Sequence, residues 1–238
     1  MSKENMNTND ICLDTNTIIS LLFFIEPEHS IIKKYLDINL KNNFYYTQHI
    51  YSECENIFQQ KLEFLNNIIE DTILFLEDNH NIIYNKNKFT SSFIKSNNNY
   101  YYKESIVKLE DIISILNIIW DNYCNESMDG FYLSQLFFKY QHFLNNSLIK
   151  YKQGIYNRLI LINKHERDYP QIEDNLLRHG SHKEDNEIIL DIYEYYLKNG
   201  IFFTFITFDK SFYNSLEECN FDFLTEIYNY ESIKAKIN

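Results

Sequence analysis

The sequence predicts an α/β fold in which a central, mainly parallel sheet is interrupted by a large helical insertion. Short apolar runs typical of buried strands alternate with stretches whose apolar residues recur every three to four positions, as in amphipathic helices. The 238 residues include only four glycines and two prolines, which disfavours the many tight turns of a sandwich or barrel. Strands that are separated by helices favour parallel pairing, and a hydrophobic fraction of 45% provides for a sizeable core.

The N-terminal part is predicted to contribute the first half of the sheet. Thr15 or Asn16 can cap the first helix with a side-chain oxygen. The elements expected here are a disordered leader at 1–10, strands at 11–13 and 44–47, and helices at 17–25, 29–41 and about 49–78.

The middle of the chain, about 65–175, is predicted to be a helical insertion within a single domain of residues 11–238. Residues 79–103 are rich in Asn and Lys without a clear period, which indicates a loop. An amphipathic helix is expected over 109–123 and a long helical stretch over 127–165. Irregular structure is expected over 168–182.

The C-terminal part is predicted to complete the sheet. A helix over about 182–198 should end at Asn199-Gly200, because glycine suits the left-handed position after a helix. A strongly apolar strand follows over 201–207, and residues 221–224 are expected to form a last edge strand.

The composition and the net charge disfavour several classes of protein. The cysteines are scattered and form no C-x-x-C pair, so a zinc ribbon, a thioredoxin-like motif and a disulfide framework are not expected. The N-terminus lacks the apolar region of a signal peptide, and the apolar run at 18–25 is too short for a bilayer. We therefore expect a soluble, cytoplasmic protein without a membrane partner. A net charge of −12 disfavours a simple electrostatic nucleic-acid binder, although it is compatible with an acidic metal site beside a local basic patch.

Carboxylates stand at related positions in the predicted fold. Asp14 directly follows the first strand, Asp209 comes two residues after the strand at 201–207, and Glu53 lies early in the helix after another strand. Ligands of parallel sheets bind beyond the carboxyl ends of the strands, so these acids should meet at one edge. Asp185, in the first turn of the helix that enters the apolar strand, should face the same edge.

Carboxylates gathered in one place raise each other's pKa unless a cation neutralises their repulsion. Hard oxygen ligands without cysteine favour Mg²⁺ or Mn²⁺ over zinc. Such an ion lowers the pKa of a bound water and stabilises charge on a phosphodiester. The pattern therefore indicates metal-dependent phosphodiester hydrolysis without a covalent enzyme intermediate.

Each carboxylate also has an ordinary structural explanation. Asp14 could cap the following helix, Asp185 could complement a helix dipole, and Asp209 could be a turn residue. The competing acids are Glu55 and Glu63 for Glu53, and Glu184, Glu187 and Asp191 for Asp185.

Basic residues near these acids are candidate ligands for phosphate groups. Arg178, His182 and Lys183 lie shortly before Asp185, and Lys210 follows Asp209. A second basic cluster could also hold phosphate groups, or it could simply be a solvated helix face. Its residues are Lys139, Lys150, Lys152, Arg158, Lys164 and Arg167.

Four short motifs resemble those of PIN-domain nucleases. Residues 11–16 resemble the family's opening motif, an apolar strand that ends in Asp-Thr-Asn. Residues 47–53 resemble its strand-end Thr followed by a helix that bears Glu, and residues 185–190 are similar to its third motif. Residues 207–212 resemble its Thr-x-Asp-x-x-Phe motif, and all four occur in the family's order over about half the chain.

The resemblance implies a PIN-like three-layer α/β/α fold and a single-strand-specific endoribonuclease that uses Mg²⁺ or Mn²⁺. Single-stranded RNA is then the expected partner, together with an antitoxin or another protein, because many family members are toxins. By this resemblance, the ligands of the metal are Asp14, Glu53, Asp185 and Asp209. The residues that support these ligands through hydrogen bonds are Thr15, Asn16 and Thr207.

The chain departs from the family pattern in two ways, and two other function classes compete. The long helical middle is absent from the small toxins, and larger residues replace the small residue often found in the third motif's helix. A haloacid-dehalogenase-like phosphatase needs a second Asp two residues after the first, but position 16 is Asn. A non-catalytic nucleic-acid- or protein-binding protein on a degenerate PIN fold would agree with the acidic charge.

Overall fold

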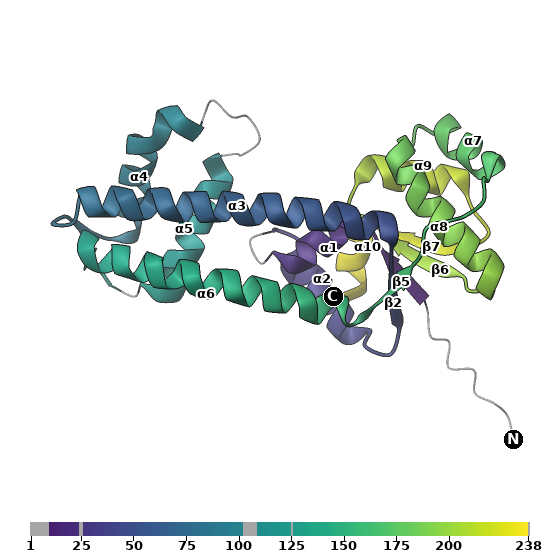
Figure 1. Cartoon of the computed structure of the whole chain (residues 1–238), viewed down its shortest axis with the longest axis horizontal. Helices are drawn as coiled ribbons and strands as arrows, with labels where there is room; N and C mark the ends of the chain where they lie inside the picture. The colour runs from purple at the N-terminus through teal and green to yellow at the C-terminus, as the bar shows by residue number, and fades with distance from the viewer. Residues whose placement is uncertain (1–9, 24–25, 102–108, 125, 238) are drawn as a thin grey trace, which may run out of the picture. The chain divides into compact units, whose positions relative to one another are not determined.

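The computed structural model describes residues 10–23, 26–101, 109–124 and 126–237 (Figure 1). Side chains at 97–111 are likewise outside the description. The chain divides into two compact units, a sheet unit of residues 1–58 and 151–238 and a helical unit of residues 59–150. Residues 1–9 of the predicted leader lie outside the described residues, and Asp10 already belongs to the first strand.

A parallel sheet forms the centre of the sheet unit. In the described part of the chain its strand order is β5-β2-β1-β6-β7, and every neighbouring pair is parallel. This confirms the expected α/β class with a mainly parallel sheet. The strands are β1 (Asp10–Leu13), β2 (Asn43–Thr47), β5 (Leu159–Ile162), β6 (Phe203–Ile206) and β7 (Leu224–Tyr228).

Strand β1 occupies the middle of this sheet, between β2 and β6. Its residues Ile11, Cys12 and Leu13 are at most 1% exposed, which explains why the strand is a continuous apolar run. Residues that follow β1 therefore lie at the centre of the sheet's carboxyl edge.

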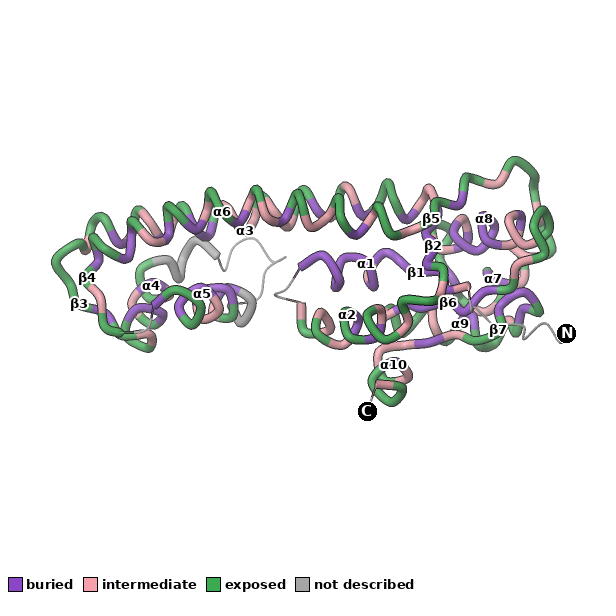
Figure 2. The backbone as a smooth tube through the Cα atoms, turned by 90° about the horizontal axis from the view of Figure 1, so that it is seen from below, coloured by how far each residue is buried: buried purple, intermediate pink, exposed green. Residues whose placement is uncertain are grey.

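Helices surround this sheet within the same unit. Helix α8 contacts β2 and β5, whereas α2 packs against both α1 and α10. Figure 2 shows that α1 is buried along almost its whole length, in agreement with its uniformly apolar or small polar sequence. The bounds are α1 (Thr15–Leu22), α2 (His29–Ile38), α3 (Gln48–Asp78), α7 (Pro170–Arg178), α8 (Lys183–Asn199), α9 (Lys210–Cys219) and α10 (Tyr230–Ile237). Helix α3 belongs to this unit only up to residue 58.

The helical unit is built around an aromatic core. The Phe89 ring lies 5.5 Å from Trp120 and 5.6 Å from Phe137 between centroids. A short antiparallel pair, β3 with β4, accompanies the helices. Besides part of α3, the elements are β3 (Ile83–Tyr84), α4 (Lys86–Tyr101), α5 (Leu109–Tyr123), β4 (Met128–Asp129) and α6 (Gly130–Tyr156), which belongs to this unit up to residue 150.

The prediction of a loop at 79–103 is wrong for 83–84 and 86–101, which form β3 and α4, and residues 102–103 lie outside the described residues. Phe89 and Phe93 lie four residues apart on one face of α4, and both are fully buried. This aromatic pair anchors a helix whose remaining Asn- and Lys-rich sequence shows little periodicity.

Predictions near the end of the middle segment also need correction. The helical stretch predicted at 127–165 stops at Tyr156, and β5 follows as an edge strand of the main sheet. The irregular region predicted at 168–182 contains α7, whose Pro170 occupies the first position, where no backbone N–H is required.

The C-terminal elements match the sequence more closely. Gly200 adopts a φ of 68° and closes α8, as expected for a glycine after a helix. The last strand, predicted at 221–224, begins at Leu224 instead. None of the described helices has the length and apolar character needed to cross a membrane.

Substitution of Gly130 by Ala is expected to destabilise the protein, because the new Cβ would lie 2.5 Å from the backbone oxygen of Asn79. Gly154→Ala is the matched control in the same helix, since no heavy atom lies within 4 Å of a Cβ there. Alanine at position 154 should stabilise the helix by about 0.5–1 kcal/mol. Thermal unfolding followed by circular dichroism should show opposite shifts, and equal melting temperatures would contradict the close contact at Gly130.

Candidate functional site

Asp14 is the buried acid at the centre of the carboxyl edge. Its backbone N–H donates to the oxygen of Ile206 at 2.9 Å, which extends the pairing of β1 with β6 by one residue. Asp14 occupies the N-cap position of α1, but its side chain makes no capping hydrogen bond. Instead, Oδ2 accepts a hydrogen bond from Thr207 Oγ1 at 2.7 Å. The simple capping explanation therefore does not account for this side chain.

Thr207 and Asn16 connect the end of β1 to the segment after β6. Thr207 Oγ1 also accepts from the backbone N–H of Asp209 at 3.0 Å. Asn16 Oδ1 accepts from the backbone N–H of Phe208 at 2.9 Å. The two polar side chains thereby fix the backbone that leads from β6 into α9, and with it the position of Asp209.

Glu53 reaches the same edge from α3. Thr15 Oγ1 donates to its Oε2 at 2.6 Å, which holds the exposed carboxylate beside the start of α1. The competing Glu55 instead pairs with Lys152, whose Nζ lies 2.8 Å from Oε2. These contacts distinguish Glu53 from its neighbour on the helix.

Asp185 lies in the first turn of α8 and is half-buried. Burial raises the pKa of its carboxyl, the charges of Asp209 and Glu53 raise it further, and His182 opposes them. The competing Glu184 is exposed. Glu187 and Asp191, further along α8, contact His49 instead.

Asp209 has a structural role in addition to any chemical one. Its Oδ1 accepts from the backbone N–H of Phe212 at 2.8 Å and caps α9. Its charge nevertheless acts on Asp185. Asp209 is thus both a helix cap and part of the same acidic group.

Burial raises the pKa of Asp14 from an ordinary 3.8 to about 7. The hydrogen bonds from Thr207 and the Thr15 backbone oppose this effect, while the charges of Asp185 and Glu53 add to it. Glu53 and Asp185 thus act on the pKa of Asp14, while Glu53 and Asp209 act on that of Asp185. Within the described ranges, however, no three Asp, Glu, His or Cys side chains are grouped so that they could hold a metal ion as placed.

The predicted phosphate ligands are all on the surface. Arg178 is exposed in the last turn of α7, His182 is the N-cap of α8, and Lys183 and Lys210 open α8 and α9. His182 is close enough to Asp185 to lower the pKa of that carboxyl. Lys152, from the second basic group, is engaged with Glu55 and lies over the Phe58 ring.

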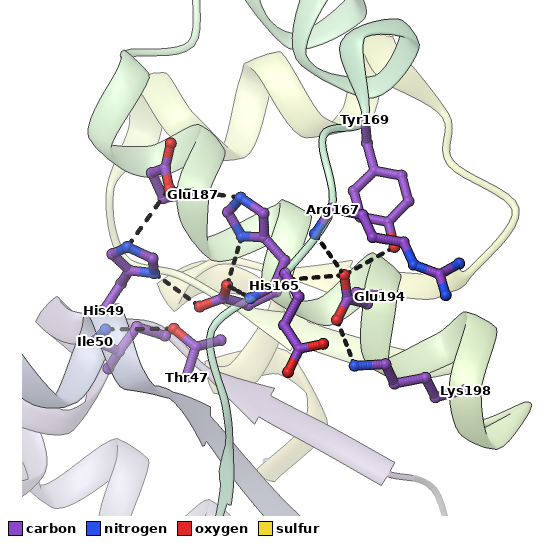
Figure 3. A network of polar contacts seen from close by, with 11 residues as sticks. Thr47, His49, Ile50, His165, Arg167, Tyr169, Glu187, Glu194 and Lys198 are labelled. Atoms are coloured by element: carbon purple, nitrogen blue, oxygen red, sulfur yellow. Dashed lines mark hydrogen bonds and ion pairs between the residues drawn. The ribbon is translucent and has the colours of Figure 1, made fainter.

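A histidine–carboxylate network that the sequence did not suggest joins α3 to α8 (Figure 3). His49 and His165 each place Nδ1 2.8 Å from an oxygen of the fully buried Asp191. Their Nε2 atoms lie 3.5 and 3.8 Å from Glu187 Oε2. The sequence signals were the i, i+4 spacings of His49 with Glu53 and of Glu187 with Asp191, whereas His165 follows a strand that was predicted to be helix.

Further along α8, Glu194 holds the segment after His165. Its Oε2 accepts from the backbone N–H groups of Glu166 and Arg167 and from the Tyr169 hydroxyl, and Lys198 contacts its other oxygen. Burial opposes ionisation of Glu194, but these hydrogen bonds outweigh burial and lower its pKa to about 2. Figure 3 shows this second group of contacts beside the histidine network.

No protein-family model, curated protein or solved structure matches the chain.

Asp14→Asn should change how stability depends on pH. Because the folded-state pKa of Asp14 is raised, its contribution to stability is fully present below about pH 4 and is lost as the pH rises to about 7. A pKa raised from 3.8 to about 7 corresponds to roughly 4 kcal/mol. Asparagine carries no charge, so the variant should gain up to roughly this much relative to wild type between about pH 4 and pH 8.

The measurement is chemical denaturation of both proteins over this pH range with a chelator present. A difference in unfolding free energy that does not vary with pH would contradict the raised pKa.

Proposed function

We propose that the chain is a Mg²⁺- or Mn²⁺-dependent endonuclease of the PIN-like type that hydrolyses single-stranded RNA. The observation that supports it most directly is the buried carboxyl of Asp14. It lies at the centre of the sheet's carboxyl edge and is coupled to the charges of Glu53 and Asp185. An acid in this environment gains from a cation that neutralises it.

The arrangement of the sheet supports a PIN-like three-layer α/β/α fold. The Asp-Thr-Asn segment leaves the central strand, and the Thr-x-Asp segment leaves its neighbour β6. Hydrogen bonds from Thr207 and to Asn16 join these two segments directly. In open parallel sheets, such an edge is where ligands bind.

The proposed metal ligands are the four carboxylates, and a donor set of oxygens suits a hard cation. Bound there, the ion would activate a water and stabilise the charge that develops on the phosphodiester. Thr15 and Thr207 orient the carboxylates of Glu53 and Asp14. Binding would draw the acids closer than they stand, and the ion would compete with the hydrogen bond from Thr15 for the exposed carboxylate of Glu53.

Exposed basic residues provide the route by which RNA would approach this acidic edge. The side chains proposed to contact backbone phosphates are Arg178, His182, Lys183 and Lys210. Three of them stand at or before the N-termini of α8 and α9, where backbone N–H groups also favour anions. A toxin role with an antitoxin partner is part of this proposal, and the helical unit is the feature that sets the chain apart from small toxins.

A non-catalytic binding protein on the same fold is the second candidate, because the net charge is −12 and no three potential ligands in the described chain stand together. Cleavage and metal binding separate the two candidates. A binding protein would retain RNA or a protein partner without metal-dependent cleavage.

Glu53→Gln is expected to reduce cleavage of a labelled single-stranded RNA by roughly 100-fold or more in Mn²⁺, because a lost ligand costs several kcal/mol of transition-state stabilisation. Glu55→Gln, two residues away on α3, is the matched control and should stay within about threefold of wild type, since Glu55 pairs with Lys152. Asp14→Asn should behave like Glu53→Gln, and a chelator should abolish the wild-type reaction.

Full activity of Asp14→Asn would refute the proposed site. Equal losses in both glutamate variants would show that the helix, rather than the Glu53 carboxylate, determines the activity. Wild-type protein that binds RNA but leaves it intact with either metal would favour the non-catalytic candidate.

A further inference from the structure

Asp191 joins three separate segments of the sheet unit through one carboxylate. It is 0% exposed and accepts from His49 Nδ1, His165 Nδ1 and the His165 backbone N–H, each at 2.8 Å. A carboxylate only accepts hydrogen bonds, so both rings must donate from Nδ1. These hydrogen bonds fix the orientation of both imidazole rings relative to α8.

Glu187 supports the same arrangement from one turn earlier on α8. Its Oε2 lies 3.5 Å from His49 Nε2 and 3.8 Å from His165 Nε2. The two rings are nearly parallel, with 28° between their planes. The histidines are thus contacted by two carboxylates of one helix, Asp191 at Nδ1 and Glu187 at Nε2, and Figure 3 shows both rings beside Glu187.

The hydrogen bond between His49 and Asp191 links α3 and α8, the helices that carry two of the proposed metal ligands. His49 precedes Glu53 by four residues on α3, so both side chains lie on the same face of that helix. Asp185 precedes Asp191 by six residues, less than two turns along α8. The His49–Asp191 hydrogen bond is therefore a direct connection between the supports of Glu53 and Asp185.

The surroundings make this connection stiff. Glu53 is held from its other side by Thr15 at 2.6 Å. The segment that carries His165 is anchored to α8 again by Glu194, which accepts two backbone N–H groups. A shift of α3 relative to α8 would break hydrogen bonds to a fully buried carboxylate, which is costly.

We propose that His49 and His165 are positioning residues that, through Asp191, set the separation of the Glu53 and Asp185 carboxylates and so the affinity of the site for its divalent cation. This inference rests on the proposed function. Groups that hold metal ligands in place affect affinity by roughly 10- to 100-fold without touching the ion. The histidines act on the carboxylates through the helices and need no contact with RNA.

The test compares two substitutions of His49, each of which places an amide nitrogen where one of the two ring nitrogens stood. In His49→Asn the amide nitrogen takes the place of Nδ1 and can still donate to Asp191, whereas in His49→Gln it takes the place of Nε2. We expect His49→Gln to raise the Mn²⁺ concentration for half-maximal RNA cleavage by roughly tenfold or more. Its kcat at saturating Mn²⁺ should change by less than about threefold, because metal binding restores the geometry. His49→Asn should stay within about threefold of wild type in both quantities.

Direct Mn²⁺ titration by calorimetry on the full chain is the second measurement, and His165→Gln against His165→Asn is a second pair if His49→Gln does not fold. A lowered melting temperature in the Gln variants with an unchanged Mn²⁺ requirement would overturn positioning and leave only a structural role. Wild-type protein that neither cleaves RNA nor binds Mn²⁺ would overturn the proposed function and this inference together. An active wild type with Gln and Asn variants that are alike would overturn the inference alone.

Discussion

A carboxyl group buried at the end of a central strand must be stabilised, and the Thr207 hydroxyl stabilises Asp14 by donating to it at 2.7 Å. The same hydroxyl accepts from the backbone of Asp209, so one side chain connects the first and last acids of the group. The parallel pairing of β1 with β6 brings these residues together across 193 positions of sequence. Without that pairing, the buried carboxyl of Asp14 would lose its side-chain donor and keep only the hydrogen bond from the Thr15 backbone, which makes burial of the acid more costly.

The remaining acids reach the edge on helices, and their placement depends on contacts away from the edge. Helix α3 carries Glu53 and also His49, while α8 carries Asp185 and also Asp191. The polar face of α8 at positions 187, 191, 194 and 198 follows a helical repeat and binds both α3 and the segment after β5. The position of the site is thus coupled to a polar network within one compact unit.

Sequence patterns predicted much of the sheet because its strands are apolar runs with clear ends. The central strand at 11–13, the strand at 44–47 and the strong strand predicted at 201–207, which is β6 at 203–206, were all recognised in this way. Strand β5 was missed because it is a half-exposed edge strand directly after a long helix, where its Leu and Ile residues continue a helical pattern. Helix α4 was missed because two buried phenylalanines anchor it without a sustained repeat.

The sequence by itself determined the fold class and the candidate acids, because strand ends and motif order are local properties that a single chain displays. It also suggested Thr15, Asn16 and Thr207 as supporting residues, and each makes a hydrogen bond at the carboxyl edge. Only the tertiary structure decided that Glu55 is paired with Lys152 while Glu53 is not, and that His49, His165 and Asp191 form one network. The physical reason is that these choices depend on which side chains meet across 26 to 142 residues of chain, and no local pattern encodes such pairings.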